Sequence, residues 1–571
     1  MKSKKLLTIL LSAIITTSSI SSVYAAEPIG IKSKYQPKTT TIFWEKGKQN
    51  NKKSATNIAS EKFNNFEEIN QFFQQNISRF GLKKGSLKST KTLKDEKGKI
   101  HYHTIYQVEG IPVYYGRIVF TTEKDSTISS INGGVDISFE NENWKNKIKL
   151  SKSDAIAKAK NNIRYEELHA SKADLYLYNF EGKSYVVYLV DLSTDAGDWN
   201  IFVNAEDGSI VNKFNNTPTL TNTRDKKFTS TKKTNTKVNK SNNLIDVQGN
   251  TIKGKGKSSL NGIVDIDLTY KDGKYYLKNS NKNIYVYDIN NKYIGYTKSD
   301  LLRASSLVEN NSNEFTDDKH IIAVDTYINL GKTYDYYKDK FNRNSIDNKG
   351  MKVEAFVDYN AVGDAAWSEE FNSMFFGNGD GKNFTHMSRS LDIVGHEFSH
   401  GVTHKESNLK YENESGALNE SFSDIMGVAI KGKNFKIGED SWTPDIEGDA
   451  IRDMQDPYKG YQPAHMKDYR SMDIRYDNGG VHVNSGIINH AAYLIADGIE
   501  KLGVENSKDI MAKLFYTANC YEWDETTNFS KCRNDLIKVT KNLYGENSKY
   551  VQIVENAFDK VGITATPQLP L

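Results

Sequence analysis

The chain has very few cysteines, only Cys520 and Cys532 among 571 residues. This number excludes the disulfide framework that holds many small secreted domains together. Both cysteines flank an expected loop between two helices, so the sequence leaves open either an oxidised pair or two buried free thiols. Because no histidine or basic partner is expected near either one, neither cysteine is a candidate nucleophile.

Long hydrophobic runs and an excess of charge of one sign are also missing. Beyond the N-terminus no segment has about 18 consecutive apolar residues, so we expect no membrane-spanning helix and no membrane partner. The 76 Lys and Arg against 72 Asp and Glu leave a net charge of +4, which gives no electrostatic basis for binding nucleic acid. At the N-terminus, lysines precede an apolar run that ends at Ile15, and Val-Tyr-Ala-Ala follows at 23–26. This pattern predicts a signal peptide over residues 1–25 and a secreted, extracellular protein.

The rest of the chain is long enough for several domains with ample cores. Residues 26–214 alternate helix and strand patterns in two modules and carry no catalytic constellation. Residues 215–243 are rich in Thr, Asn and Lys and almost free of apolar side chains, which predicts an exposed, easily cleaved linker. A permanent interdomain linker is the alternative. Residues 244–405 predict a β-rich lobe that ends in a long helix, and residues 406–571 predict a mainly helical lobe.

The pattern His-Glu-x-x-His in that long helix is the most informative feature of the chain. Two histidines four residues apart, His396 and His400, lie on one face of a helix, so both imidazoles can reach one metal ion with Glu397 beside it. The pattern is typical of zinc proteases, although a solvated helix face is the alternative. Twenty residues later, Glu420 and Asp424 begin an expected second helix after a Gly-containing turn. One of these carboxylates can bind the metal, and the other can accept a proton from a metal-bound imidazole.

Three blocks in this order resemble the thermolysin-like neutral metalloproteases. They are the His-Glu-x-x-His motif, Tyr-Glu-Asn-Glu-Ser-Gly-Ala-Leu-Asn-Glu at 411–420, and Asp-Asn-Gly-Gly-Val-His-Val-Asn-Ser-Gly-Ile-Ile-Asn at 477–489. The resemblance covers roughly residues 245–565, and the preceding part resembles the family's propeptide. It implies an α+β fold with a two-lobed zincin catalytic unit: a β-rich N-terminal lobe, a mainly α-helical C-terminal lobe and a cleft between them, preceded by an α+β propeptide.

The resemblance also implies roles for individual side chains. One zinc ion would polarise a water molecule and the scissile carbonyl group, while a carboxylate takes up the proton of the water. The implied catalytic set is the zinc ligands His396, His400 and Glu420, the general base Glu397, the oxyanion donors His482 and Tyr411, and Asp477, which orients His482; Asp424 and Asn419 stand behind the ligands. The implied substrate-binding set is Arg452, Asp364, Ala365, Phe384, Met387, Ile393, Ile437 and Ile451. The last five would form an apolar pocket, which implies cleavage on the N-terminal side of Leu, Ile, Phe or Val.

The sequence departs from the family at two places. Asp364 stands where the family usually has Asn, which removes two hydrogen-bond donors, adds a charge and is expected to shift specificity. The family's paired calcium site would use Asp392 and Glu439, but Lys431 replaces an acidic partner. We hypothesise that the Lys431 ammonium group takes the place of a calcium ion by pairing with those two acids. A second calcium loop is better kept, and its implied ligands are Trp442, Thr443, Ile446 and Asp449.

The leading interpretation is a secreted zinc endopeptidase with structural calcium, made as a latent precursor. It would act on protein and peptide substrates as a monomer, with its own propeptide as intramolecular inhibitor or folding aid. A calcium-stabilised binding or adhesin protein on an inactive protease fold is an alternative, which would predict loss of Glu397 or of a ligand. A third interpretation is a zinc hydrolase that acts on non-peptide esters or amides. The implied apolar pocket and the implied binding of substrate backbone by Arg452 argue against this interpretation.

Overall fold

The computed structural model describes most of the chain beyond the N-terminus. The predicted signal peptide and almost all of the predicted linker lie outside the described residues. Among the residues that the structure describes, no helix is long and apolar enough to cross a membrane. The described residues are 39–46, 58–165, 168–194, 197–215, 248–289, 301–302, 304–358, 363–369 and 371–566.

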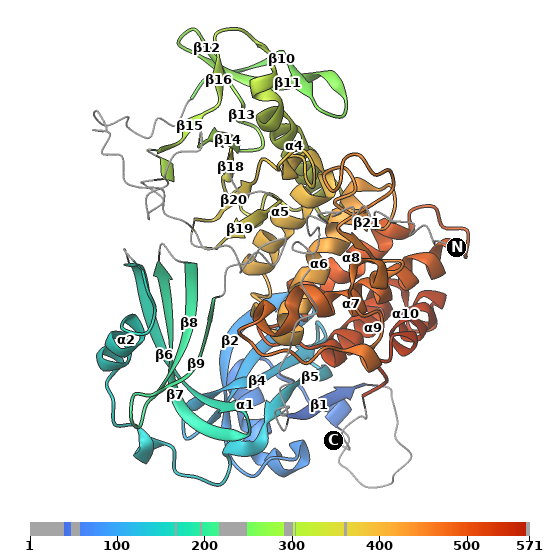
Figure 1. The fold of residues 1–571 in the computed structure, drawn as a ribbon. Helices are drawn as coiled ribbons and strands as arrows, with labels where there is room; N and C mark the ends of the chain where they lie inside the picture. The colour runs from blue at the N-terminus through green and yellow to red at the C-terminus, as the bar shows by residue number, and fades with distance from the viewer. Residues whose placement is uncertain are drawn as a thin grey trace, which may run out of the picture.

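Residues 39–215 form an N-terminal unit built on one continuous sheet, at the bottom of Figure 1. Its strand order is β1-β5-β4-β6-β7-β8-β9, and β2 joins through β3 to β4. The strands are β1 (Thr39–Glu45), β2 (Ser86–Lys94), β3 (Ile100–Val108), β4 (Ile111–Thr122), β5 (Ile128–Asp136), β6 (Leu168–Phe180), β7 (Lys183–Thr194), β8 (Gly197–Asn204) and β9 (Ile210–Asn215).

Two helices accompany this sheet. The first, α1 (Phe66–Gln75), is followed by a separate 3-10 turn (Ile77–Phe80) that ends at Gly81 with φ 76°. The second, α2 (Lys152–Lys160), begins after Ser151 in the pattern Ser-x-x-Asp, which is typical of a helix start. The side chain of Ser151 accepts a bond from the Asp154 amide, and the Asp154 carboxylate accepts one from the Ser151 amide.

The β-rich lobe contains two further sheets, drawn towards the top of Figure 1. One has the order β16-β12-β11-β10-β17, and the other has the order β13-β14-β18-β20-β19 with β15 beside β14. Helix α4 (Ile321–Phe341) packs on both sheets. The strands are β10 (Asn250–Ser258), β11 (Gly262–Lys271), β12 (Lys274–Tyr276), β13 (Lys278–Asn279), β14 (Ile284–Asp288), β15 (Ser306–Leu307), β16 (Glu309–Asn310), β17 (Glu314–Phe315), β18 (Val353–Val357), β19 (Ala365–Ser368) and β20 (Ser373–Phe376).

The helical lobe follows α5 (Leu391–Lys405), which carries the His-Glu-x-x-His motif. Its main helices are α6 (Asn413–Lys431), α7 (Asp477–Glu500), α8 (Ser507–Tyr521), α9 (Phe529–Tyr544) and α10 (Lys549–Lys560), with a short β21–β22 pair (Lys436–Ile437 and Arg452–Asp453). The prediction of a Gly-containing turn before Glu420 is wrong, because α6 starts at Asn413 and Gly416 lies inside this helix. A Cβ atom at Gly416 would meet Val481 Cγ1 at 2.4 Å, so this glycine permits close packing against α7.

Helices α5 and α6 lie side by side at the centre of the molecule (Figure 1). Gly427 of α6 faces the main chain of α5, and a Cβ atom there would come within 2.5 Å of the Asp392 carbonyl oxygen. A Cβ atom on Gly395 would lie 3.3 Å from the Gly427 Cα. Glycine on both helices therefore allows an unusually close approach. One apolar core surrounds the pair and includes residues of both lobes.

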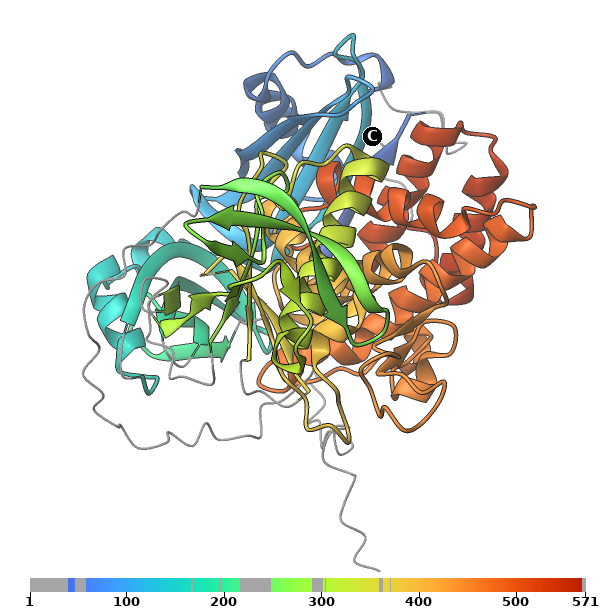
Figure 2. The same ribbon diagram turned by 90° about the horizontal axis from the view of Figure 1, so that it is seen from above.

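The N-terminal unit packs against α8 and α9 through polar side chains. Figure 2 shows its blue strands beside the red helices of the C-terminal part. Asn132 donates to Asp535 at 2.6 Å, and Lys538 donates to Thr121 at 2.7 Å. Cys520 and Cys532 are both buried free thiols, so the disulfide alternative is wrong.

The sequence favours surface or strand positions over metal ligation for His101 and His103. They are strand residues, but they are not on the surface, because both lie buried in this interface. His103 Nε2 donates to the Tyr521 carbonyl oxygen at 3.0 Å. Burial lowers the pKa of His103 to about 3, and the charges of Lys531, His101 and Lys91 act in the same direction. A histidine in the unfolded chain titrates near 6.5, so the native state binds fewer protons between these two pH values. The stabilising contribution is therefore complete above pH 6.5 and decreases as the pH falls below it.

We predict that His103→Gln removes this pH dependence, because glutamine can still donate to Tyr521 but does not titrate. Between pH 7 and pH 5 the protein with His103 should lose about 2 kcal/mol more unfolding free energy than the variant. Urea unfolding of the full chain measures this, in a Glu397→Gln background that is expected to prevent self-cleavage. Equal pH slopes for the two proteins would contradict the prediction.

Candidate active site

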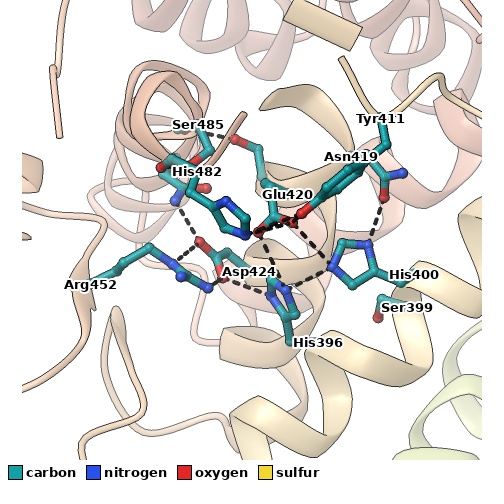
Figure 3. A network of polar contacts seen from close by, with 12 residues as sticks. His396, Ser399, His400, Tyr411, Asn419, Glu420, Asp424, Arg452, His482 and Ser485 are labelled. Atoms are coloured by element: carbon teal, nitrogen blue, oxygen red, sulfur yellow. Dashed lines mark hydrogen bonds and ion pairs between the residues drawn. The ribbon is translucent and has the colours of Figure 1, made fainter. Parts of the chain in front are cut away.

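Three side chains from α5 and α6 converge at one point. One ligand atom each of His396, His400 and Glu420 lies within 4.8 Å of the other two, and this is the one such group of metal-binding side chains among the described residues. The two Nε2 atoms are 2.9 Å apart, and they lie 3.5 and 3.4 Å from the Glu420 carboxylate oxygens (Figure 3). All three residues are at most 2% exposed.

This donor set fits a zinc ion. Two imidazole nitrogens and a carboxylate are a known ligand set for catalytic zinc, with one position left for water. The Glu420 Oε2 atom is buried and accepts no hydrogen bond, which a bound cation would compensate. Burial lowers the pKa of His396 to about 4, and the neighbouring His400 contributes, so the His396 ring is neutral as a ligand requires.

Polar side chains behind the ligands fix their orientation. His396 Nδ1 donates to Asp424 at 2.9 Å and His400 Nδ1 donates to Asn419 at 2.9 Å, which leaves each Nε2 lone pair directed at the metal position. Arg452 donates to Asp424 from Nε at 2.8 Å and from Nη2 at 2.7 Å. Burial opposes ionisation of Asp424, but Arg452 and His396 outweigh it and lower the pKa of Asp424 to about 2. The Arg452 guanidinium group, expected to hold a substrate carbonyl, is thus engaged with Asp424 in this state.

Glu397 follows the ligand His396 in α5, interacts electrostatically with His400 and Glu420, and is fully buried. Burial raises the pKa of Glu397 to about 8, and the negative charges of Glu420 and Asp364 act in the same direction. Such a shift is typical of carboxylates that exchange protons near neutral pH.

Tyr411 and His482 also lie close to the Glu420 carboxylate, and Asp477 holds His482. The Tyr411 hydroxyl group donates to Glu420 Oε1 and is 3.1 Å from His482 Nε2 (Figure 3). His482 Nδ1 is bonded to Asp477, and the same carboxylate accepts the main-chain N–H groups of His482 at 3.0 Å and Val483 at 3.2 Å. The Asp-Asn-Gly-Gly block thus forms a kinked helix start, with φ values of 47°, 83° and 89° at residues 478–480, that holds His482 beside the ligands.

Two further residues contribute, and neither was assigned a role from the sequence, although Asn489 is the last residue of the 477–489 block. Asn489 Nδ2 donates to Asp424 at 2.8 Å, and Gln462 Nε2 donates to the His482 carbonyl oxygen at 2.5 Å and to Ser485 at 2.9 Å. All three bonds join residues that are at least 20 positions apart in the sequence, and periodicity does not detect such pairs.

The predicted substrate-binding residues divide into two groups. The five apolar ones are all at most 9% exposed and belong to one core cluster. They are Phe384, Met387, Ile393, Ile437 and Ile451. Ala365 begins the edge strand β19 and is buried, while the neighbouring Asp364 accepts the Gly377 amide at its main-chain carbonyl oxygen and is less buried than Ala365.

The Lys431 hypothesis holds for one of its two acids. Lys431 Nζ lies 2.9 Å from Asp392 and 2.7 Å from Asp440, so the predicted partner Glu439 is wrong. Glu439 instead lies near the ammonium groups of Lys433 and Lys436. The carboxylate of Asp440, the residue after Glu439, points towards Lys431 instead.

The second predicted calcium loop is closed by internal bonds. Asp449 Oδ2 accepts from the Thr443 hydroxyl group at 2.8 Å and from the Trp442 indole at 3.0 Å. Ile446 at the tip of this loop is 59% exposed.

A buried His-His-Glu set, with a second glutamate beside it and two donors facing it, defines the site of a zinc metallopeptidase. The sequence comparisons agree. Residues 253–404 match the thermolysin metallopeptidase catalytic domain and residues 407–563 its alpha-helical domain. Residues 85–135 match the fungalysin/thermolysin propeptide motif, and residues 149–214 match the peptidase propeptide and YPEB domain.

Curated relatives match over most of their length. The chain is 36% identical to bacillolysin from Bacillus cereus over 475 residues, which is 80% of this chain and 81% of that protein. It is 32% identical to thermolysin from Alicyclobacillus acidocaldarius subsp. acidocaldarius, with 81% and 84% covered. Among solved structures, the precursor of protealysin, a metalloproteinase from Serratia proteamaculans, is 31% identical; the match covers 49% of this chain and 87% of that one, with a TM-score of 0.42. The chain belongs to the thermolysin metallopeptidase family and is a zinc metalloendopeptidase with propeptide domains.

The buried Lys431 pair generates a stability prediction. Lys431→Met leaves Asp392 buried without its cation, and breaking such a pair should lower the unfolding free energy by about 3–5 kcal/mol. Lys433→Met is the matched control, because that side chain is 64% exposed and its loss should matter by less than about 1 kcal/mol. Urea unfolding measures both. Equal stability of the two variants would show that Lys431 does not hold Asp392.

Proposed function

We propose that the chain is the precursor of a secreted, monomeric endopeptidase that uses Glu397 as general base and cleaves before bulky hydrophobic residues. The observation that carries this proposal is the convergence of His396, His400 and Glu420 beside the fully buried Glu397. In this proposal residues 1–25 direct export, and cleavage within 215–243 separates the propeptide from the catalytic unit.

Glu397 is proposed to handle the protons of the reaction. A zinc ion at this site would polarise a water molecule and the substrate carbonyl group. The raised pKa of Glu397 lets its carboxylate take a proton from water near neutral pH and pass it to the leaving amine.

Tyr411 and His482 are proposed to stabilise the negative charge that develops on the carbonyl oxygen. Both lie near the same carboxylate oxygen of Glu420, and Asp477 holds Nδ1 of His482 so that Nε2 points towards the site. His482 donates from Nε2 when both ring nitrogens carry a proton. Donors at such a position are often worth about 3 kcal/mol each.

Substrate selection is proposed to reside in the five apolar residues and in two charged ones. Apolar side chains at 384, 387, 393, 437 and 451 favour Leu, Ile, Phe or Val after the cleaved bond. We expect Arg452 to bind a substrate carbonyl group and Asp364 to add a negative charge beside Glu397. The loop at 442–449 is proposed to hold a structural calcium ion with oxygen atoms of Thr443 and Asp449, a chemistry that suits this ion.

Casein digestion by the purified, processed protein tests the catalytic role. Glu397→Gln should lower the rate about 10²–10⁴-fold, because proton transfer by a positioned base contributes that much. Glu500→Gln, a surface change on α7, is the matched control and should leave the rate unchanged. Equal clearing by the Glu397 variant would defeat the mechanism, and an inactive wild-type chain with zinc bound would favour the binding-protein alternative.

A peptide library tests the specificity. Cleavage sites should carry Leu, Ile, Phe or Val on the C-terminal side of the cut bond, and mass spectrometry of the products reads this directly. Dominant selection for acidic or basic residues at that position would refute the pocket assignment.

A further inference from the structure

The propeptide contacts the short connection between the two metal-binding helices. Strand β4 of the propeptide carries Tyr114 and Tyr115 next to each other. The Tyr115 hydroxyl group donates to Glu412 at 3.0 Å, and Lys410 Nζ lies 3.8 Å from the centre of the Tyr114 ring. The two catalytic-unit residues held in this way are the immediate neighbours of Tyr411.

Two further propeptide residues support the connection between α5 and α6, one directly at Glu406 and one indirectly at Lys410. Lys91 Nζ of strand β2 donates to the Glu406 carbonyl oxygen at 2.8 Å, at the C-terminal end of α5, where a positive charge is favourable. Arg117, also in β4, pairs with the Glu525 carboxylate, and the Glu525 carbonyl oxygen accepts the Lys410 amide at 2.8 Å. Propeptide side chains therefore hold the connection along its length.

A second contact reaches the segment before His482. Ile474 packs in an apolar cluster with aromatic side chains of the propeptide. Three residues later comes Asp477, which bonds to His482. The propeptide members of the cluster are Tyr114, Tyr178, Leu189, Val187, Phe202 and Phe214.

These contacts are energetically significant because they are buried. Glu412 is 1% exposed and Tyr114 is fully buried. Loss of the Tyr115 hydroxyl group would leave a buried carboxylate short of a donor, and an amine–ring contact away from water is stronger than an exposed one. The position of residues 406–412 is thus linked to the presence of the propeptide.

We propose that the propeptide regulates the active site by clamping two segments, 406–412 and 474–477, that position Tyr411 and His482. In the clamped precursor the Tyr411 hydroxyl group is bonded to Glu420 and is not available to a substrate. Removal of the propeptide releases both segments, and Tyr411 can then turn from the ligand to the substrate. This inference rests on the proposed function, because it assigns the regulation of the same site.

Hydrogen–deuterium exchange on the full-length, zinc-supplemented precursor tests the clamp, in the Glu397→Gln background so that the chain stays uncleaved. Tyr115→Phe and Tyr114→Leu should each raise amide exchange in peptides that cover 406–416 by about tenfold or more. Tyr188→Phe is the matched control, since that hydroxyl group bonds to the Leu150 carbonyl oxygen inside the propeptide. Exchange at 406–416 should not change in the control.

Unchanged exchange at 406–416 in the Tyr115 variant would overturn the clamp, as would an equal increase in the Tyr188 control. If Tyr114→Leu fails to fold, the conservative Tyr115→Phe decides alone. The measurement needs no catalysis, so its failure leaves the proposed peptidase activity intact. Conversely, an inactive processed protein would remove the proposed function without altering the exchange result.

Discussion

The close approach of α5 and α6 is the constraint on which the site depends. Two imidazoles come from one helix and a carboxylate from the other, so a metal ion can be shared only if the helix axes are near each other. Gly395 and Gly427 remove the side chains that would separate them. At one end of the pair, Lys431 joins Asp392 and Asp440 across the helices. Close packing of the glycines and the charge pairing of Lys431 therefore both fix the distance between α5 and α6.

The loop that joins these helices lies against the propeptide. It carries Tyr411, and its neighbours Lys410 and Glu412 are held by the propeptide. The propeptide interface contains buried charges as well as an apolar cluster, so its strength depends in part on compensation between both partners. An interface of this kind can be firm in the precursor and still separate after cleavage, because water can solvate the exposed charges on both sides.

Local spacing predicted the main helices and the convergence of the metal-binding side chains, because residues four apart lie on the same face of a helix. Contacts between segments that are distant in the sequence were harder to predict. Gly416 suggested a turn, but its role is packing against Val481. The cation in the α5–α6 pair was predicted correctly as Lys431, yet its second acid is Asp440, since only the loop conformation decides which neighbour points inwards. The 477–489 block includes Asn489, but nothing in the sequence indicated its bond to Asp424.

Anomalous diffraction at the zinc absorption edge, from crystals of the processed protein grown with zinc, shows whether these three side chains bind one zinc ion. We expect one strong peak about 2.0–2.1 Å from Nε2 of both His396 and His400 and in contact with the Glu420 carboxylate. Absence of a peak at this position in fully loaded protein, or rings turned away from each other, would contradict it.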